Sequence, residues 1–141
     1  SRGDLDVCGG GFIMTGPDEE TVAKNREWAR YRVSFYGSTP GYRPVMSLHG
    51  WDDLADKLLH MTKTGQWKNM AAEVPDDVLD HFGVFTTYDE LPAAIEERFG
   101  GISDTVEIAF EDDTDPELAK EVLSGVHAVP SGFEALADRF A

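Results

Sequence analysis

Cysteine and long apolar runs are almost missing from this chain of 141 residues. The single cysteine, Cys8, excludes an internal disulfide and a cysteine-based zinc site, and it favours a cytoplasmic protein. No apolar run approaches the roughly 20 residues that span a bilayer, and no basic stretch followed by an apolar one resembles a secretory signal. The chain begins at Ser1 rather than Met, so the missing signal says nothing about a longer parent protein. We expect no membrane partner.

Basic residues are also scarce, because 12 Lys and Arg stand against 27 Asp and Glu and give a formal net charge of −15. This charge repels a phosphate backbone and no Lys/Arg cluster offsets it, so we expect no nucleic-acid partner. An acidic excess is usually a solvated surface, with a salt-loving source as the alternative. The length and the 41% of hydrophobic residues fit one folded domain.

The sequence lacks the motifs of several enzyme classes. The four histidines lie far apart in the sequence without metal-ligand spacing, so we expect no metal site. A Gly-x-Ser-x-Gly elbow and a phosphate-binding loop are absent. Cys8 lies in a predicted buried strand, which favours an inert core residue over a nucleophile.

Two segments have the pattern of strands. Residues 5–15 predict a buried strand interrupted by Gly9 to Gly11, which indicate either a close approach to the backbone or a weak strand end. Residues 105–110 predict a second strand in which Val106, Ile108 and Phe110 face one way.

Helices are predicted between and after these strands. The first begins at Pro17 and ends near Tyr36, and Thr87 with Glu90 has the spacing of a capping box. The other predicted segments are an irregular stretch over 37–51, helices over 53–63, 66–73, 75–82 and 87–100, a brief extended piece at 84–85, a helix over 117–124 and a weak helical pattern over 133–140. The order of strand, helices, strand and helix is typical of βα units and a parallel sheet, so the predicted fold class is α/β. Two strands cannot close such a sheet.

The irregular stretch 37–51 is the one segment whose residue types point to a binding site. Ser38 and Thr39 offer hydroxyls, Tyr42 an aromatic ring with a polar tip and Arg43 a fixed cation, which together suit an anionic or planar ligand. The alternative is structural: Tyr42 and Trp51 pack the segment down while Arg43 pairs with one of the many acids. The sequence leaves both interpretations open.

This segment also carries a resemblance to a known family. Phe35-Tyr-Gly-Ser-Thr-Pro-Gly-Tyr-Arg-Pro-Val45 followed by Leu48-His-Gly-Trp51 resembles the luciferase-like (bacterial luciferase-type) oxidoreductases that use coenzyme F420. Further similar stretches are Phe12-Ile-Met-Thr15, Asp18-Glu-Glu-Thr-Val22, Gly65-Gln-Trp67, Met70-Ala71, Val78-Leu79-Asp80 and Tyr88-Asp-Glu-Leu91. The resemblance covers about 6–110 and leaves the acidic tail 111–141 unassigned.

The resemblance implies that residues 1–141 are the C-terminal part of a (β/α)8 barrel, with about two strands and a helix-rich insertion. The parent would then transfer hydride between coenzyme F420 and an organic substrate, while this piece alone would be inactive. Within that parent, we expect the cofactor to be bound by Ser38, Thr39, Tyr42 and Arg43, the residues chosen above for their side-chain chemistry, and the resemblance assigns no catalytic residue. An FMN-dependent luciferase-like monooxygenase, a non-catalytic interaction domain and a homo-oligomer remain open alternatives.

Overall fold

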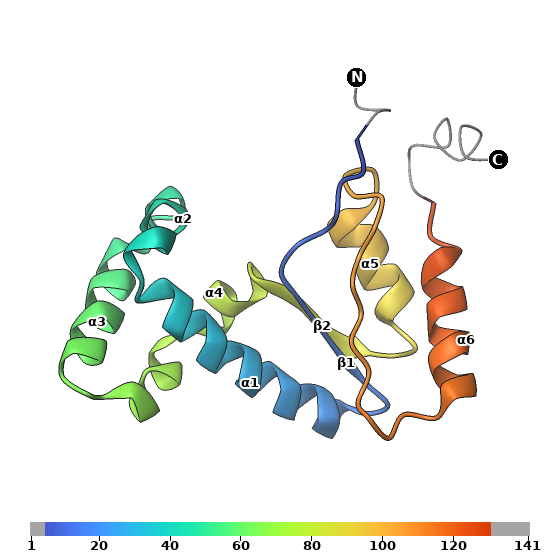
Figure 1. The fold of residues 1–141 in the computed structure, drawn as a ribbon, viewed down its shortest axis with the longest axis horizontal. Coiled ribbons are helices and arrows are strands. Elements are labelled where there is room, and N and C mark those ends of the chain that lie inside the picture. Colours follow the sequence, from blue (N-terminus) through green and yellow to red (C-terminus); the bar gives the residue numbers. More distant parts are fainter. Residues whose placement is uncertain (1–4, 131–141) are drawn as a thin grey trace. The chain divides into compact units, whose positions relative to one another are not determined.

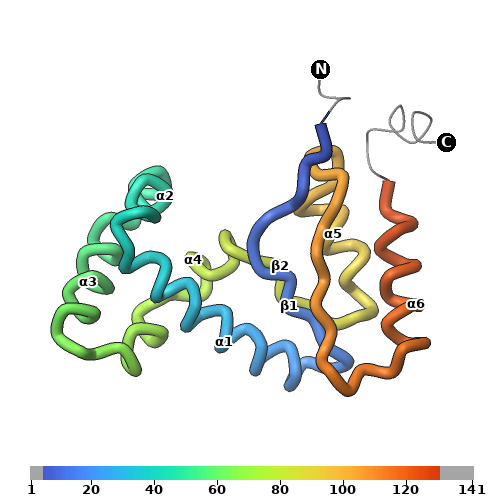
Figure 2. Tube along the Cα trace, viewed as in Figure 1, coloured from blue at the N-terminus to red at the C-terminus, as the bar shows by residue number. Residues whose placement is uncertain are grey.

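The structure is a computed structural model that describes residues 5–130, and its chain divides into two compact units (Figures 1 and 2). The first unit contains the chain up to Ala23 and again from Gly83 onward. The second unit contains residues Lys24–Phe82. The long helix α1 (Glu19–Gly37) runs from one unit into the other.

A two-stranded parallel sheet forms the centre of the first unit. Strand β1 (Phe12–Gly16) pairs along its whole length with β2 (Gly83–Thr87), and Ile13 lies opposite Val84 in the register. The predicted mixture of helices with a parallel sheet is therefore confirmed. The second strand, however, is the piece that the sequence marks only as briefly extended at 84–85.

One face of this sheet carries the hydrophobic core of the unit. Two helices, α5 (Leu91–Phe99) and α6 (Pro116–His127), pack on it (Figure 1). The buried residues of this core are Ile13, Val84, Tyr88, Leu91, Ile95, Phe99, Val122 and Val126. Because successive strand residues point to opposite faces, Ile13 and Val84 belong to the face that these helices cover.

The opposite face of the sheet is also apolar. It carries Phe12, Met14 and Phe85, each of which is half-buried. Parallel sheets usually have both faces covered, and their strands are apolar on both sides. Two parallel strands with this composition therefore have the character of strands from a larger sheet.

Residues 105–110 do not form the predicted second strand. Only one isolated bridge, between Thr105 and Cys8, joins them to the rest of the chain as a β-pair. The predicted alternation is nevertheless present, because Val106, Ile108 and Phe110 pack against the core. The side chains satisfy the pattern, while the backbone lacks a continuous ladder of hydrogen bonds.

The glycine run before β1 allows other residues to approach its backbone closely. This is one of the two interpretations that the sequence allows for Gly9 to Gly11. A Cβ at Gly9 would lie 2.9 Å from the Phe99 ring and 3.0 Å from Val106. The Gly9 amide donates to the Thr105 carbonyl at 2.6 Å. The expectation that Cys8 is a buried strand residue is wrong, since β1 begins only at Phe12 and Cys8 is exposed.

The predicted capping box before α5 is absent. Thr87 is the last residue of β2, so it cannot be the cap residue of the helix that follows. Glu90 instead accepts a hydrogen bond from the Thr86 hydroxyl at 2.9 Å. The helix begins at Leu91, with Pro92 in its first turn.

The second unit is almost wholly helical. Besides most of α1 it contains α2 (Arg43–Leu48), α3 (Asp52–Lys63) and α4 (Asp76–Asp80), with 3-10 turns at Pro40–Tyr42, Trp67–Asn69 and Ala71–Glu73. Residues 37–51 are therefore not irregular as predicted. Pro40 and Pro44 each occupy the first turn of a helical segment, where the missing N–H is tolerated.

Close packing and ion pairs hold α1 to the other helices of the second unit. Ala29 and Val33 of α1 are buried, and a Cβ at Gly37 would lie 3.2 Å from Leu58 of α3. Arg30 donates to the Val74 carbonyl at 2.6 Å and pairs with Asp76 at the start of α4. These contacts connect the middle of α1 with the chain about 45 residues further on.

Two predictions remain, one on the C-terminal residues and one on membrane-spanning helices. The weak helical pattern over 133–140 lies outside the described residues. Among the helices that the structure describes, none has the length and apolar character needed to cross a bilayer.

The start of α6 gives a first test of the fold. The Asp115 carboxylate accepts from the Glu117 amide at 2.8 Å and from the Leu118 amide at 3.4 Å. We expect Asp115→Ala to lower the free energy of unfolding by about 1 kcal/mol, the usual loss for such a cap. Chemical denaturation measures this loss. Asp115→Asn, which keeps the accepting oxygen, should stay near the wild-type value, and an equal loss in both variants would contradict the cap.

The Arg30–Asp76 pair gives a second test through its pH dependence. A hydrogen bond from Arg30, and then the charge of that guanidinium, lower the pKa of Asp76 from its ordinary 3.8. The Asp76 carboxylate thus binds a proton less readily in the folded protein than in the unfolded chain. Its pair with Arg30 therefore stabilises the fold above about pH 4, and this stabilisation disappears as the pH falls through the lower pKa of the folded state.

We therefore expect Asp76→Asn to melt below wild type at pH 6 and to approach it as the pH falls below 3.8 and through the lower folded pKa. Melting temperatures of both proteins across that range provide the measurement. Asp53→Asn is the control, because Asp53 has no ion pair among the described residues. A melting difference for Asp76→Asn that does not change with pH would refute the assignment.

Candidate functional site

The carboxyl ends of β1 and β2 are the first place to look for a site. Ligands of parallel α/β folds bind where the strands end, and these two strands end side by side at Gly16 and Thr87. The residues that follow are strongly acidic: Asp18, Glu19, Glu20, Asp89 and Glu90. This edge therefore repels an anionic ligand rather than attracting one.

The polar atoms nearest these ends are already used by the fold. The Asp18 carboxylate accepts from the Thr21 amide at 2.8 Å, and this hydrogen bond lowers the pKa of Asp18. The Tyr88 amide donates to the Gly16 carbonyl at 3.0 Å. The carboxylate serves as the cap of α1, and the Tyr88 hydrogen bond continues the pairing of the strands.

The four predicted cofactor-binding residues lie in the second unit, at the end of α1 and the start of α2. Ser38 is buried, and its hydroxyl donates to the Phe35 carbonyl at 2.6 Å. The Thr39 hydroxyl donates to the Tyr36 carbonyl at 2.8 Å. Both hydroxyls therefore satisfy carbonyls in the last turn of their own helix, as serine and threonine commonly do.

Arg43 is held by two carboxylates of α3. Its guanidinium donates to Asp56 at 2.6 Å and lies 3.3 Å from Asp52. The hydrogen bond to Asp56, and then the nearby acidic charges, raise the pKa of Arg43, while Arg43 lowers the pKa of Asp56. In this arrangement the cation is neutralised by its own unit.

The aromatic residues of this region pack on one another. The Tyr42 ring stacks on Tyr36 with centroids 5.1 Å apart, and Trp51 stacks on His49 at 4.4 Å. His81 completes this second group at 5.1 Å from His49, so these two histidines are close in space although far apart in sequence. Within the described residues no group of three or more His, Cys, Asp or Glu could hold a metal ion.

Together these contacts match the structural alternative for residues 37–51. Tyr42 and Trp51 pack on neighbouring rings, and Arg43 is paired with acids. An anionic, planar cofactor needs a free cation or several free N–H donors, and the described arrangement of these four residues supplies neither. The cofactor-binding role of Ser38, Thr39, Tyr42 and Arg43 stays a prediction, and it requires Arg43 to exchange its partners.

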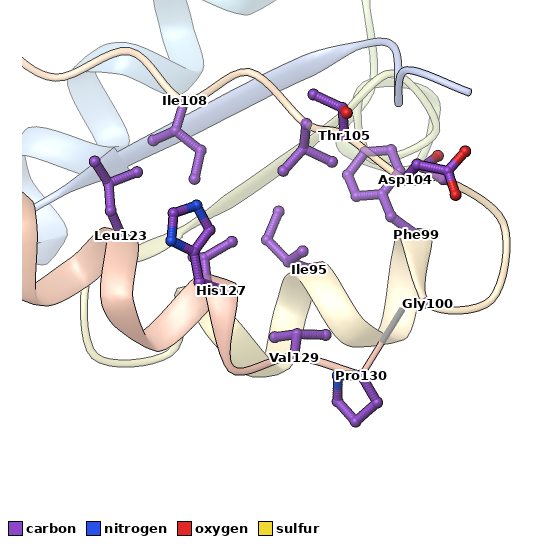
Figure 3. A pocket seen from close by; sticks show the side chains of 13 residues that line it. Ile95, Phe99, Gly100, Asp104, Thr105, Ile108, Leu123, His127, Val129 and Pro130 are labelled. Atoms are coloured by element: carbon purple, nitrogen blue, oxygen red, sulfur yellow. The ribbon is translucent and has the colours of Figure 1, made fainter. Parts of the chain in front are cut away.

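The structure reveals a groove that the sequence did not indicate. It has a volume of about 320 Å³ and lies in the first unit, between α5, α6 and the extended residues 103–108 (Figure 3). Apolar side chains dominate its wall, including Ile95, Phe99, Ile108, Leu123 and Val126. His127 and Asp104 are its titratable residues among those described.

The surface that lines this groove is about equally polar and apolar, so its composition favours no single class of ligand. Its wall combines residues of three separate segments. Two of its residues, Val106 and Ile108, belong to the alternating pattern that the sequence analysis assigned to a strand. The Asp104 carboxylate at its edge accepts a hydrogen bond from the Val7 amide at 2.8 Å.

Comparison with known proteins finds relatives in mycobacteria. An uncharacterized protein of Mycobacterium bovis and one of Mycobacterium tuberculosis strain H37Rv are each 36% identical over 95 residues, which is 67% of this chain and 28% of the relative. The chain thus spans less than a third of the length of the curated relatives it matches. No family model matches the chain. No solved structure matches it either.

Arg43 provides the test that separates the two interpretations. Because Asp52 and Asp56 already hold it, we expect Arg43→Ala to lower the melting temperature by about 1–3 °C, as for other exposed ion pairs. We expect the affinity of the full-length protein for coenzyme F420 to stay unchanged. Thermal melting and a fluorescence titration measure the two quantities.

Asp56→Asn is the matched variant, since it breaks the same pair from the other side. It should reproduce the small loss of melting temperature. If Arg43 instead binds the cofactor, Arg43→Ala weakens binding by about tenfold or more, while Asp56→Asn removes one of the two carboxylates that compete for the cation and tightens binding.

Proposed function

We propose that this chain is the C-terminal part of a luciferase-like oxidoreductase with a (β/α)8 barrel, in which it supplies two neighbouring strands and their helices. The observation that carries this proposal is the pairing of β1 with β2. The strands are adjacent and parallel, they are joined through helices, and apolar residues occupy both faces. These are the properties of consecutive strands in a barrel.

The size of the mycobacterial relatives supports the proposal. Since 95 residues are 28% of a relative, that relative has roughly 340 residues. A barrel of this class needs about 250 residues. Two strands expose an incomplete sheet, whereas a chain of the relatives' length has room for the other six.

In the whole protein the proposed reaction is transfer of a hydride between coenzyme F420 and an organic substrate, in the cytoplasm. The part described here does not fit the cofactor by itself, because acids follow both strand ends and two carboxylates hold Arg43. The anionic groups of the cofactor therefore have to be held mainly by residues outside this chain. This chain completes the barrel and positions the segments that flank its open end.

Cofactor titration tests the proposal. We expect a full-length mycobacterial relative to bind coenzyme F420 with a dissociation constant in the micromolar range or below, measured by quenching of the cofactor fluorescence. The isolated chain of 141 residues should show no saturable binding at about 100 μM, because a pocket at the mouth of a barrel draws on loops from several strands. FMN is titrated in parallel.

Each other outcome excludes part of the proposal. Micromolar binding to the isolated chain would show that the missing strands are not needed. A relative that binds FMN and not coenzyme F420 identifies the FMN-dependent branch of the superfamily. A relative that binds neither supports a non-catalytic interaction domain and ends the oxidoreductase proposal.

A further inference from the structure

The groove of the first unit lies where the described part of the chain ends. Its wall includes Val129 and Pro130, the last two described residues, and Figure 3 shows Pro130 at its edge. The Val129 amide donates to the Val126 carbonyl at 3.1 Å, which closes a turn directly after α6. Pro130 has no amide hydrogen with which to continue a helix. The chain therefore leaves α6 at the rim of the groove.

This groove extends the hydrophobic core of the unit to the surface. Phe99 and Val126 belong to that core and also form part of the wall. Leu123 of α6 lines the groove and is nevertheless 36% exposed, and Ile102, next to the lining residue Ser103, is 63% exposed. Each accessible apolar side chain forgoes the free energy that burial would supply, so a hollow of this kind is normally covered.

The size of the groove suits a few side chains better than a cofactor. Its volume of about 320 Å³ is at the lower end of the roughly 300–1,000 Å³ found for pockets that hold a whole small molecule. Its surface is about equally polar and apolar. A peptide with apolar side chains on one side and polar groups along its edges has partners for both kinds of surface.

The sequence that follows the groove has these properties. Residues 131–141 lie outside the described residues, and Ser131 with Glu134 has the spacing of a capping box at the start of a helix. Three large apolar residues then recur at the spacing of one side of a helix, with the charged residues between them. An isolated helix of this length is marginal in water, so the pattern requires a surface to pack on. The three apolar residues are Phe133, Leu136 and Phe140.

We propose that residues 131–141 dock their apolar side into the groove between α5, α6 and residues 103–108 of the same chain. The segment buries the accessible side of Leu123 and completes the hydrophobic core of the first unit. The groove is then filled by the chain itself, and it is not the substrate site of the enzyme proposed above.

The covalent connection selects this segment over other parts of a longer protein. Phe133 is three residues from Pro130, which is at most about 10 Å along an extended chain. A segment held by so short a link meets the groove at an effective concentration in the millimolar range. Another segment, a second copy or a ligand has to compete with it. The inference uses only residues of this chain and does not depend on the proposed oxidoreductase reaction.

Proteolysis of the 141-residue chain tests the proposal. Chymotrypsin cleaves after large apolar residues, so cleavage at Phe133 and Phe140 reports access to the segment. We expect both sites to be cleaved at least about tenfold more slowly in the chain than in a synthetic peptide of residues 129–141, because cleavage follows the population of the open form. Mass spectrometry measures the rates. They should stay constant between about 2 and 200 μM chain, since the contact lies within one molecule.

Two substitutions on α6 locate the contact. Leu123→Gln places an amide in the wall of the groove and should raise the cleavage rates at least about fivefold, toward those of the peptide. Leu118→Gln makes the same change at a residue of similar exposure, 38% against 36%, that does not line the groove. It should change the rates less than about twofold. Circular dichroism checks that both variants are folded.

A second pair lies in the segment itself and covers the case in which Leu123→Gln does not fold. Leu136→Gln removes the middle of the apolar side, and Ala135→Gln introduces the same amide on the opposite side of the predicted helix. The first should raise cleavage at Phe133 and Phe140 at least about fivefold, and the second less than about twofold. Each rate is divided by that of a peptide with the same substitution, which removes any effect on the protease itself.

A wild-type segment that is cleaved as fast as the free peptide would overturn the proposal. So would protection that neither Leu123→Gln nor Leu136→Gln reduces, because the segment is then held at another surface, and so would an equal effect of Leu118→Gln. Protection that appears only at high chain concentration also contradicts it, since a second copy then supplies the segment. None of these results changes the cofactor titration, so the two proposals fail separately.

Discussion

The parallel pairing of β1 with β2 is the contact on which the first unit depends. It joins residues 12–16 to residues 83–87, and the members of the hydrophobic cluster other than Ile13 and Val84 all come after β2 in the chain. Ile13 and Val84 lie opposite each other beneath α5 and α6. Without this pairing, the two helices would have no common surface to cover. The pairing also brings the two strand ends together, and it thereby places the acids that follow both strands at one edge.

Patterns within single elements were enough to predict most helices. Pro17 predicted the start of α1 to within two residues, and the helix expected over 53–63 is α3 (Asp52–Lys63). The strands were harder to predict. Strand β2 has only five residues, and it is a strand because it pairs with β1 and not because its own sequence has a clear strand pattern. Residues 105–110 show the converse case. Their alternation reflects side-chain packing against α5 and α6, and this packing does not need a ladder of hydrogen bonds.

The candidate site shows why residue types alone do not define a binding surface. From the sequence alone, Arg43 in a stretch of aromatic and hydroxyl residues suits an anionic ligand. The sequence does not show which groups of the folded protein already pair with its guanidinium. Its actual partners, Asp52 and Asp56, lie on a separate helix, so their presence follows from the packing of α2 against α3. The groove of the first unit could not be found from the sequence for the same reason. In contrast, the spacing of Trp28, Tyr31 and Phe35 predicts that they share one side of α1, once the extent of that helix is known.

In the order of the chain, the whole second unit lies between the paired strands β1 and β2. This position affects where homologous chains can differ in length. Only the ends of a crossover are fixed by the strands it joins, and doubling the length of a flexible connection adds only about 0.6 kcal/mol to the free energy of closure. Natural homologues should therefore tolerate insertions and deletions between residues 24 and 82. Strands β1 and β2 should keep their length, because removal of one residue from either would turn its core side chains, such as Ile13 or Val84, to the wrong face of the sheet.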